Sequence, residues 1–227
     1  MRVLLRLMVI IALPVVLTIT VVRLVTLPWY AAWEYRKANF PPDPLGMETA
    51  DRLQLARLSI HFLNLPRGSG LLDDLRLPDG AVAFNARELQ HMDDVKVVYD
   101  RLTLAAGLLL AVGALVGWAL VRWWGRAALW GALSDGGLLT LLILVLLGAW
   151  MAVGFEAFFT AFHGIFFTGD SWLFAYDDTL IRLFPLEFWS DAGMLIAGIV
   201  GVIALALALF GRAVQKRAER PAEASPA

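Results

Sequence analysis

Residues 84–101, FNARELQHMDDVKVVYDR, run directly into residues 102–121, LTLAAGLLLAVGALVGWALV. The second stretch contains no charged residue, and it has the length that a helix needs to cross a hydrocarbon core of ~30 Å. In the first stretch, Asn85 is followed three residues later by Glu88, a pattern typical of a capping box. We therefore expect a helix that begins at about Ala86 and continues into a membrane span.

Three more stretches share this apolar character. The chain has 227 residues, 59% of them hydrophobic, and a mean hydropathy of +0.69, whereas soluble proteins have nearer half apolar residues and no long uncharged runs. The sequence therefore predicts an all-α membrane protein with four transmembrane helices and a small, mostly helical extracytoplasmic domain between the first two. The expected segments are spans at 1–28, 102–121, 138–160 and 192–211, an outer domain at 29–101, a loop at 122–137, an outer interfacial segment at 161–191 and a tail at 212–227.

Basic residues are distributed unequally between the two sides of this arrangement. The N-terminus, the 122–137 loop and the tail together carry eight of the 19 Lys and Arg residues but only three of the 20 acids. Because an excess of Lys and Arg marks the cytoplasmic face, both termini are predicted inside the cell, and 29–101 and 161–191 outside. The eight basic residues are Arg2, Arg6, Arg122, Arg126, Arg212, Lys216, Arg217 and Arg220.

The outer segment 29–101 contains two local patterns. The stretch ETADRLQLARLSIHFLNL, residues 48–65, has the spacing of apolar residues that is typical of an amphipathic helix. The stretch LRLPDGAVAF, residues 75–84, alternates around Pro-Asp-Gly and indicates a short hairpin. His61 lies on the amphipathic helix without an acidic neighbour in its turn, and we expect it to be a surface residue.

Composition excludes several kinds of site. The chain has no cysteine, so disulfides, thiol nucleophiles and cysteine-based metal sites are excluded. The net charge is −1, which gives no basic surface for nucleic acid. The sequence contains no Gly-x-Ser-x-Gly, HExxH, P-loop or Rossmann motif. The function is therefore sought in the three histidines and their surroundings.

His91 stands between two acids at helical spacing. Glu88 precedes it by three residues and Asp94 follows it by three, so the three side chains lie on adjacent turns of the predicted helix. A carboxylate beside His91 would fix its tautomer and favour its protonation. The alternative is a solvated, polar helix face, and the position of His91 alone does not separate the two.

His163 follows the third span in a run of aromatic residues. If that helix continues to His163, then Glu156, Thr160 and His163 fall on one stripe at i, i+4 and i+7. An acid so close to the hydrocarbon is costly and usually faces a partner or a cavity. The alternative is that Glu156 and His163 are interfacial residues flanked by phenylalanines. We favour the functional interpretation and expect Glu156 to support His163.

The two histidine blocks resemble those of a known family. FNARELQHMDDVK is similar to one block of the bacterial integral membrane family of lipoprotein intramolecular transacylases (Lit), and FHGIFF…W…LIRLFPLEFW is similar to another. Four spans, with the larger outer segment between the first two, also match this family. The resemblance implies that His91 and His163 correspond to the two essential histidines of the family.

The resemblance also implies a reaction. The family moves the sn-2 acyl chain of a diacylglyceryl-modified lipoprotein cysteine to the α-amine of that cysteine, at the outer leaflet of the bacterial cytoplasmic membrane. The partners implied are a diacylated lipoprotein N-terminus and membrane lipid, and no cofactor or metal is implied. Since the substrate supplies the nucleophile, no catalytic serine is needed, and Ser171 is not expected to carry an acyl group.

Neither the residues nor the resemblance decides which histidine is the base. We take His163 as the base and His91 as the acid or oxyanion donor, and the reverse order is equally open. Lys96 and Arg182 are the other candidate oxyanion donors. The residues expected to support or orient the histidines are Glu88, Asp94, Glu156, Lys96 and Arg182.

Two other functions stay open from the residues alone. In the first, His91, His163, Glu88 and Asp94 are metal ligands of a lipid hydrolase, because two histidines with carboxylates can hold zinc. In the second, the chain is a non-enzymatic membrane partner whose histidines relay protons or sense pH.

Overall fold

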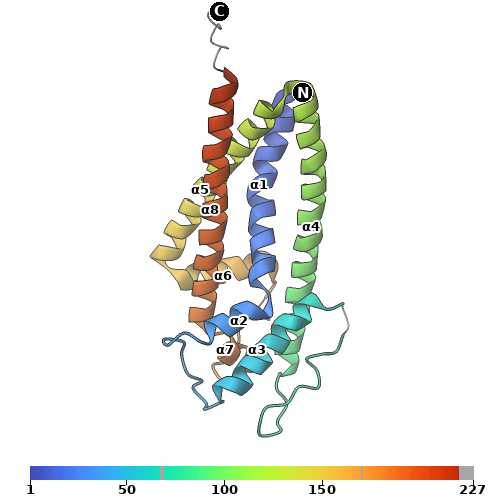
Figure 1. The fold of residues 1–227 in the computed structure, drawn as a ribbon. Coiled ribbons are helices and arrows are strands. Elements are labelled where there is room, and N and C mark those ends of the chain that lie inside the picture. Colours follow the sequence, from blue (N-terminus) through green and yellow to red (C-terminus); the bar gives the residue numbers. More distant parts are fainter. Residues whose placement is uncertain (67–68, 170, 220–227) are drawn as a thin grey trace, which may run out of the picture. The chain divides into compact units, whose positions relative to one another are not determined.

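The computed structural model describes residues 1–66, 69–169 and 171–219, and helices dominate this part of the chain (Figure 1). Four of the helices are long and apolar enough to cross a membrane, namely α1, α4, α5 and α8. The prediction of an all-α protein with four membrane-spanning helices is confirmed. The helices are α1 (Arg2–Val25), α2 (Pro28–Glu34), α3 (Thr49–Asn64), α4 (Ala86–Trp124), α5 (Arg126–Val153), α6 (Phe155–Phe166), α7 (Thr179–Leu183) and α8 (Leu186–Glu219).

The predicted loop at 122–137 is wrong, because α5 begins at Arg126 and only Gly125 interrupts the helical chain. Gly125 has φ +79°, a left-handed conformation that glycine adopts without steric cost. The polar residues that suggested a loop are satisfied by helix packing instead. Asp135 forms a 2.7 Å ion pair with Arg6, and the Ser134 hydroxyl donates a 2.8 Å hydrogen bond to the Ala208 carbonyl.

The third span also ends earlier than predicted. Helix α5 stops at Val153, and Gly154, in extended conformation, separates it from α6. Glycine has the lowest helix propensity after proline, about 1 kcal/mol below alanine, so it is a natural position for the break. His163 therefore lies on a separate short helix and not on a continuation of the span.

The chain folds as two compact units. The first comprises residues 1–21, 104–149 and 196–227. Its helices approach closely at small residues: a Cβ atom added to Gly137 of α5 would lie 2.5 Å from the Ala204 carbonyl oxygen of α8. Only glycine permits this contact between the two helices, in the manner common among membrane helices.

The second unit comprises residues 22–103 and 150–195. Segment 29–101, expected to be a domain by itself, is thus one part of a unit that two distant parts of the chain build together. Buried hydrogen bonds join the parts: the Tyr30 hydroxyl donates to the Phe188 carbonyl at 2.9 Å, and the Tyr35 hydroxyl to the Leu183 carbonyl at 2.7 Å.

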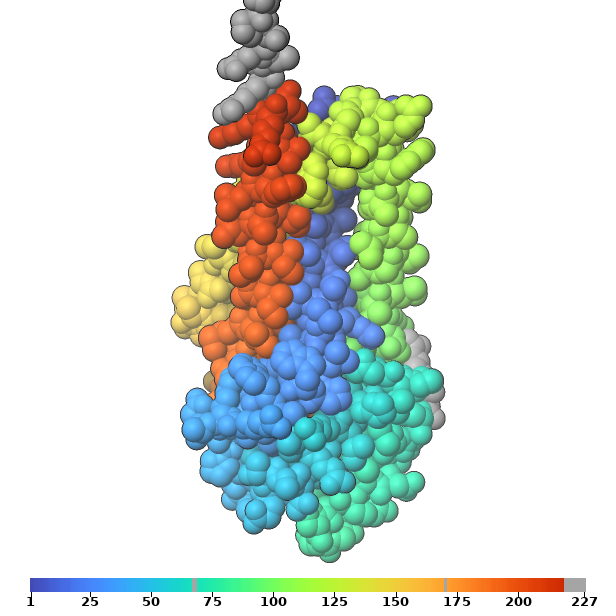
Figure 2. Space-filling view, viewed as in Figure 1, coloured from blue at the N-terminus to red at the C-terminus, as the bar shows by residue number. Residues whose placement is uncertain are grey.

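Helix α3 confirms the predicted amphipathic helix, and it packs against α2 and α7 within the second unit. Figure 2 shows the side chains of α2 and α3 forming one continuous surface on the viewed face. The predicted hairpin is present only as a single antiparallel bridge between Arg76 and Val82. His61 is exposed, as expected. The buried residues of α3 are Arg52, Leu55, Ala56, Ser59, Ile60 and Phe62.

Candidate active site

The two histidines of interest come together in the second unit. His91 lies on α4 and His163 on α6, and their ring centroids are 6.4 Å apart with an angle of 22° between the ring planes. His91 is buried and His163 is half-buried. Two imidazoles lie side by side at this distance, and each ring has one nitrogen that can donate a hydrogen bond and one that can accept a proton.

The His163 ring is packed among aromatic rings. The Phe159 ring centroid lies 4.0 Å from that of His163, and the Trp172 ring stacks on it at 4.8 Å with an interplanar angle of 28°. Phe159 and Phe167 lie four residues before and after His163, and this helical spacing predicts from the sequence that both rings lie beside His163. Trp172 carries no such signal in the sequence.

The hydrogen bond of His163 determines its tautomer. Its Nδ1 lies 2.8 Å from the Phe159 carbonyl oxygen, which can only accept, so the neutral ring carries its proton on Nδ1. The Nε2 lone pair is then free to take a proton. Burial lowers the pKa of His163 below its ordinary value of 6.5, and the hydrogen bond to Phe159 offsets only part of this effect. His163 is therefore neutral near pH 7, as a general base requires.

His91 is held by apolar contacts. The Phe167 and Phe174 ring centroids lie 5.0 and 5.1 Å from that of His91. Its Nδ1 atom is buried and has no hydrogen-bond partner among the residues that the structure describes. The ring is therefore positioned by packing, and its nitrogens are not committed to a neighbouring carboxylate.

Glu88 has a different role from the predicted one. Its buried carboxylate accepts hydrogen bonds from the backbone N–H groups of Asn85 at 2.8 Å and Leu180 at 2.7 Å. The Asn85 side chain in turn accepts from the N–H of Glu88 at 3.1 Å, which confirms the predicted capping box. Glu88 thus joins the beginning of α4 to the beginning of α7 and does not hold the His91 ring.

Asp94 lines a cavity of about 270 Å³. The Phe167 ring, which contacts both histidines, forms part of the same wall. Asp94 is half-buried and makes no hydrogen bond or ion pair with a described residue, so it does not orient His91 as predicted. The structure thus places a polar cavity beside the histidine pair. Its lining residues are Gln90, Asp94, Val97, Val98, Arg101, Phe166, Phe167, Thr168 and Ser171.

The two candidate oxyanion donors are bound elsewhere. The Lys96 ammonium donates to the Leu63 carbonyl at 3.1 Å and pairs with Asp100 at 3.6 Å. The Arg182 guanidinium donates two 2.9 Å hydrogen bonds to Asp43. Burial alone would raise the pKa of Asp43, but Arg182 and two backbone N–H groups hold it below its ordinary value. Both cations are therefore engaged by partners within the unit.

Glu156 is exposed on α6 and forms no hydrogen bond or ion pair within the described part of the chain. The prediction that it supports His163 is therefore wrong in its geometry, although both residues lie on one helix. The periodicity identified a common stripe, whereas the hydrogen-bond partner of His163 is a backbone carbonyl one turn away.

The arrangement does not assemble the metal-ligand set of the alternative hydrolase. Across residues 1–66, 69–169 and 171–219, no group of three or more His, Cys, Asp or Glu side chains is placed to hold a metal ion. Glu88 in particular has its carboxylate oxygens engaged by backbone N–H groups.

Comparison with known proteins identifies the family. The family model for the lipoprotein intramolecular transacylase Lit matches residues 5–189. A curated Aquifex aeolicus protein described as uncharacterized is 31% identical over 195 residues, which are 81% of this chain and 83% of the relative.

Solved structures agree in fold. That of the membrane integral lipoprotein intramolecular transacylase Lit from Bacillus cereus superposes with a TM-score of 0.78 at 21% identity, covering 97% of this chain and 99% of that one. A variant of the same protein with a histidine replaced by alanine gives a TM-score of 0.74 at 20% identity, covering 97% and 96%. Because the family model spans most of the chain, this protein belongs to the lipoprotein intramolecular transacylase (Lit) family of membrane enzymes.

Proposed function

We propose that the chain transfers the sn-2 acyl group of a diacylglyceryl-modified lipoprotein cysteine to the α-amine of that cysteine. The amine nitrogen attacks the ester carbonyl, an N–C bond forms, and the C–O bond to glycerol breaks. One proton leaves the nitrogen and one is delivered to the glyceryl oxygen, so the product is an N-acyl lyso-form lipoprotein. The reaction needs no water and no second substrate.

The observation that carries this proposal is the pairing of His91 and His163 at 6.4 Å beside a polar cavity. In the proposed mechanism, the free Nε2 of His163 takes the proton from the attacking nitrogen, which becomes strongly acidic as the N–C bond forms. His91, which is buried among apolar rings, donates a hydrogen bond from its neutral ring to the oxyanion, and the His163 imidazolium then delivers its proton to the departing glyceryl oxygen. The Nδ1–carbonyl bond of His163 supports this order of the two roles.

The substrate itself makes a small catalytic apparatus sufficient. Amine and ester belong to one molecule, so binding converts the attack into a step of high effective molarity. The enzyme then has to orient two groups and move protons. Ser171 lines the cavity but has no described base in hydrogen-bond contact, so we assign it no nucleophilic role.

The proposal is tested with the purified chain in nanodiscs and a synthetic diacylated lipopeptide. Fragmentation by mass spectrometry should locate one acyl chain on the α-nitrogen, with no free fatty acid released. Release of fatty acid that stops with a chelator would instead identify a metal-dependent hydrolase. Absence of any reaction by the purified chain would favour a non-enzymatic partner.

We also propose that the histidines act at the outer leaflet of the bacterial cytoplasmic membrane. Both histidines belong to segments that the distribution of Lys and Arg assigns to the outside, together with both termini inside. The substrate, a diacylated lipoprotein held in the membrane by its two chains, is available at that depth. No nucleic acid is involved.

Cysteine labelling tests this orientation, because the chain has no native cysteine. An impermeant thiol reagent added to intact spheroplasts should label Asn39→Cys, which is exposed in the second unit, and should not label Ala218→Cys in α8 until the membrane is permeabilised. The reverse pattern would place the histidines in the cytoplasm and contradict the proposed site of action.

The pH dependence of the rate should report the burial of His163. A base must be unprotonated, and the pKa of His163 is lowered, so the fall in kcat that His163 causes should lie below pH 6.5, separate from the fall at about pH 7.7–8.0 that protonation of the substrate α-amine causes. Glu156→Gln should leave both this acidic limb and the rate unchanged within about twofold, because the side chain is exposed and touches no described partner. An acidic limb that moves in Glu156→Gln would show that a carboxylate does support the ring.

A further inference from the structure

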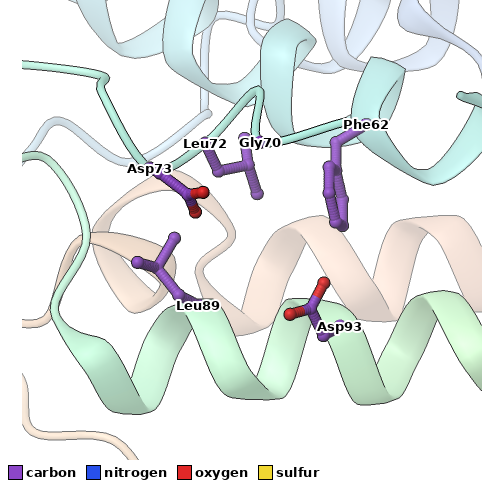
Figure 3. A pocket seen from close by; sticks show the side chains of 6 residues that line it. All are labelled: Phe62, Gly70, Leu72, Asp73, Leu89 and Asp93. Atoms are coloured by element: carbon purple, nitrogen blue, oxygen red, sulfur yellow. The ribbon is translucent and has the colours of Figure 1, made fainter. Parts of the chain in front are cut away.

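Two adjacent acids of α4 face different cavities. Asp93 lines a cavity of about 130 Å³ with Phe62 and Asp73, and Figure 3 shows its carboxylate pointing into that space. Asp94 lines the larger cavity of about 270 Å³ with Phe167. Since successive helical residues point about 100° apart, one helical turn presents two carboxylates to two separate environments.

The cavity of Asp94 shares one wall residue, Phe167, with the surroundings of the histidine pair. The Phe167 ring in its wall has its centroid 5.0 Å from that of His91 and 5.8 Å from that of His163. Asp94 also follows His91 by three residues on α4, so the two residues occupy adjacent turns on one side of the helix. A group bound by Asp94 is therefore next to groups that the histidines hold.

Asp94 has no counter-charge from the described protein. Two acids of the same unit are paired with arginines: Asp43 binds Arg182 at 2.9 Å, and Asp178 binds Arg87 at 3.2 Å. Asp94 forms no such contact with a residue that the structure describes, and it is half-buried. A partly desolvated carboxylate that faces a cavity forms its strongest hydrogen bonds with a cationic donor.

We infer that Asp94 binds the α-ammonium group of the substrate's N-terminal cysteine and thereby selects lipoproteins with a free N-terminus. This inference rests on the proposed function, because it takes the diacylated lipoprotein as the ligand. The α-amine has a pKa of about 7.7–8.0, so most of it arrives as ammonium near pH 7. The same carboxylate can accept a hydrogen bond from the amine after the proton has left.

Selection by charge also separates substrate from product. After acyl transfer the nitrogen is an uncharged amide, so its attraction to Asp94 is lost while the two remaining chains stay in the membrane. Product release is favoured for this reason. A lipoprotein whose nitrogen already carries an acyl group lacks the same charge and is bound weakly.

The positive charge of Arg101, which also lines this cavity, is compatible with ammonium binding by Asp94. Arg101 lines the cavity two helical turns beyond Asp94, about 10 Å along the axis at 1.5 Å per residue, and these two described residues form no ion pair with each other. The carboxylate is therefore not neutralised, and the guanidinium is free to donate to a peptide or ester carbonyl of the same substrate.

The test uses two unreactive lipopeptides. Both carry a glyceryl-cysteine with ether-linked chains, which cannot be transferred, and they differ only in a free or an acetylated α-amine. Their Kd values are measured with the full chain in nanodiscs at pH 6.5. The wild type should bind the free amine at least about tenfold more tightly, and Asp94→Asn should reduce this preference to near one.

The neighbouring acid supplies a matched control. Asp93→Asn removes the same charge from the same helical turn but from the other cavity, so it should keep the wild-type preference. Equal binding of both ligands by the wild type would overturn the inference, as would an undiminished preference in Asp94→Asn or a lost one in Asp93→Asn. Acyl transfer to an ester substrate is assayed separately. If the wild type transfers the acyl chain but binds the free and the acetylated amine equally, the role of Asp94 is overturned and the proposed function stands.

Discussion

Replacing either His91 or His163 with alanine should lower the rate of acyl transfer at least ~100-fold, which is the lower end of the usual contribution of a general acid or base. The two rings lie 6.4 Å apart on different helices, and in the proposed mechanism they serve different steps, so neither substitutes for the other. The measurement is the initial rate of N-acyl product formation from a diacylated lipopeptide, quantified by mass spectrometry.

The third histidine is the control for this experiment. His61 is exposed on α3, and His61→Ala should keep the wild-type rate. Circular dichroism and the thermal midpoint of each variant show whether the fold persists, since His91 packs between Phe167 and Phe174. A folded His91→Ala or His163→Ala enzyme with near-normal rate would contradict the two-histidine mechanism.

Arg182→Ala should destabilise the protein by about 3 kcal/mol, because it leaves the buried Asp43 carboxylate without its counter-charge. The pair is bidentate, with both N–O distances at 2.9 Å, and the Arg182 carbonyl also accepts a 2.6 Å hydrogen bond from Arg52. The measurement is the unfolding free energy or thermal midpoint in detergent, compared with that of the wild type.

An exposed arginine of the same unit provides the comparison. Arg87 pairs with Asp178 at 3.2 Å, but half of its side chain is exposed, so Arg87→Ala should cost less than about 1 kcal/mol. Asp43→Asn combined with Arg182→Ala should recover part of the lost stability, since it removes the unpaired charge. If Arg182→Ala abolishes the rate and leaves stability intact, the guanidinium acts on the reaction and not on the fold.

The membrane spans could be predicted because they depend on composition and length alone. The capping box at Asn85 and Glu88 could also be predicted, since its partners lie within one turn. The predicted beginning of the third span and the predicted 122–137 loop are wrong for one reason. Polar residues between two apolar runs indicate exposure to water, whereas Asp135 and Ser134 have their partners on neighbouring helices.

The surroundings of the histidines were less predictable. Helical spacing identifies residues that share one face of a helix. It does not show that these residues are hydrogen-bond partners, as was predicted for Glu88 with His91 and Glu156 with His163. Glu88 instead binds the backbone of Leu180, and Arg182 binds Asp43, contacts that span 92 and 139 positions of the chain. Nothing in a single sequence reports such distant pairings. The aromatic packing of His163 was visible only in part, through Phe159 and Phe167.

The second unit is stabilised by hydrogen bonds and ion pairs between residues that lie far apart in the chain and are therefore synthesised at different times. Tyr30 and Phe188 are 158 positions apart, and the Lys37 ammonium reaches Asp191 across 154 positions at 2.6 Å. The nascent chain therefore cannot complete this unit until α8 has begun to emerge from the ribosome. During most of translation His91 has no His163 beside it, so the histidine pair forms only after α6 has been synthesised.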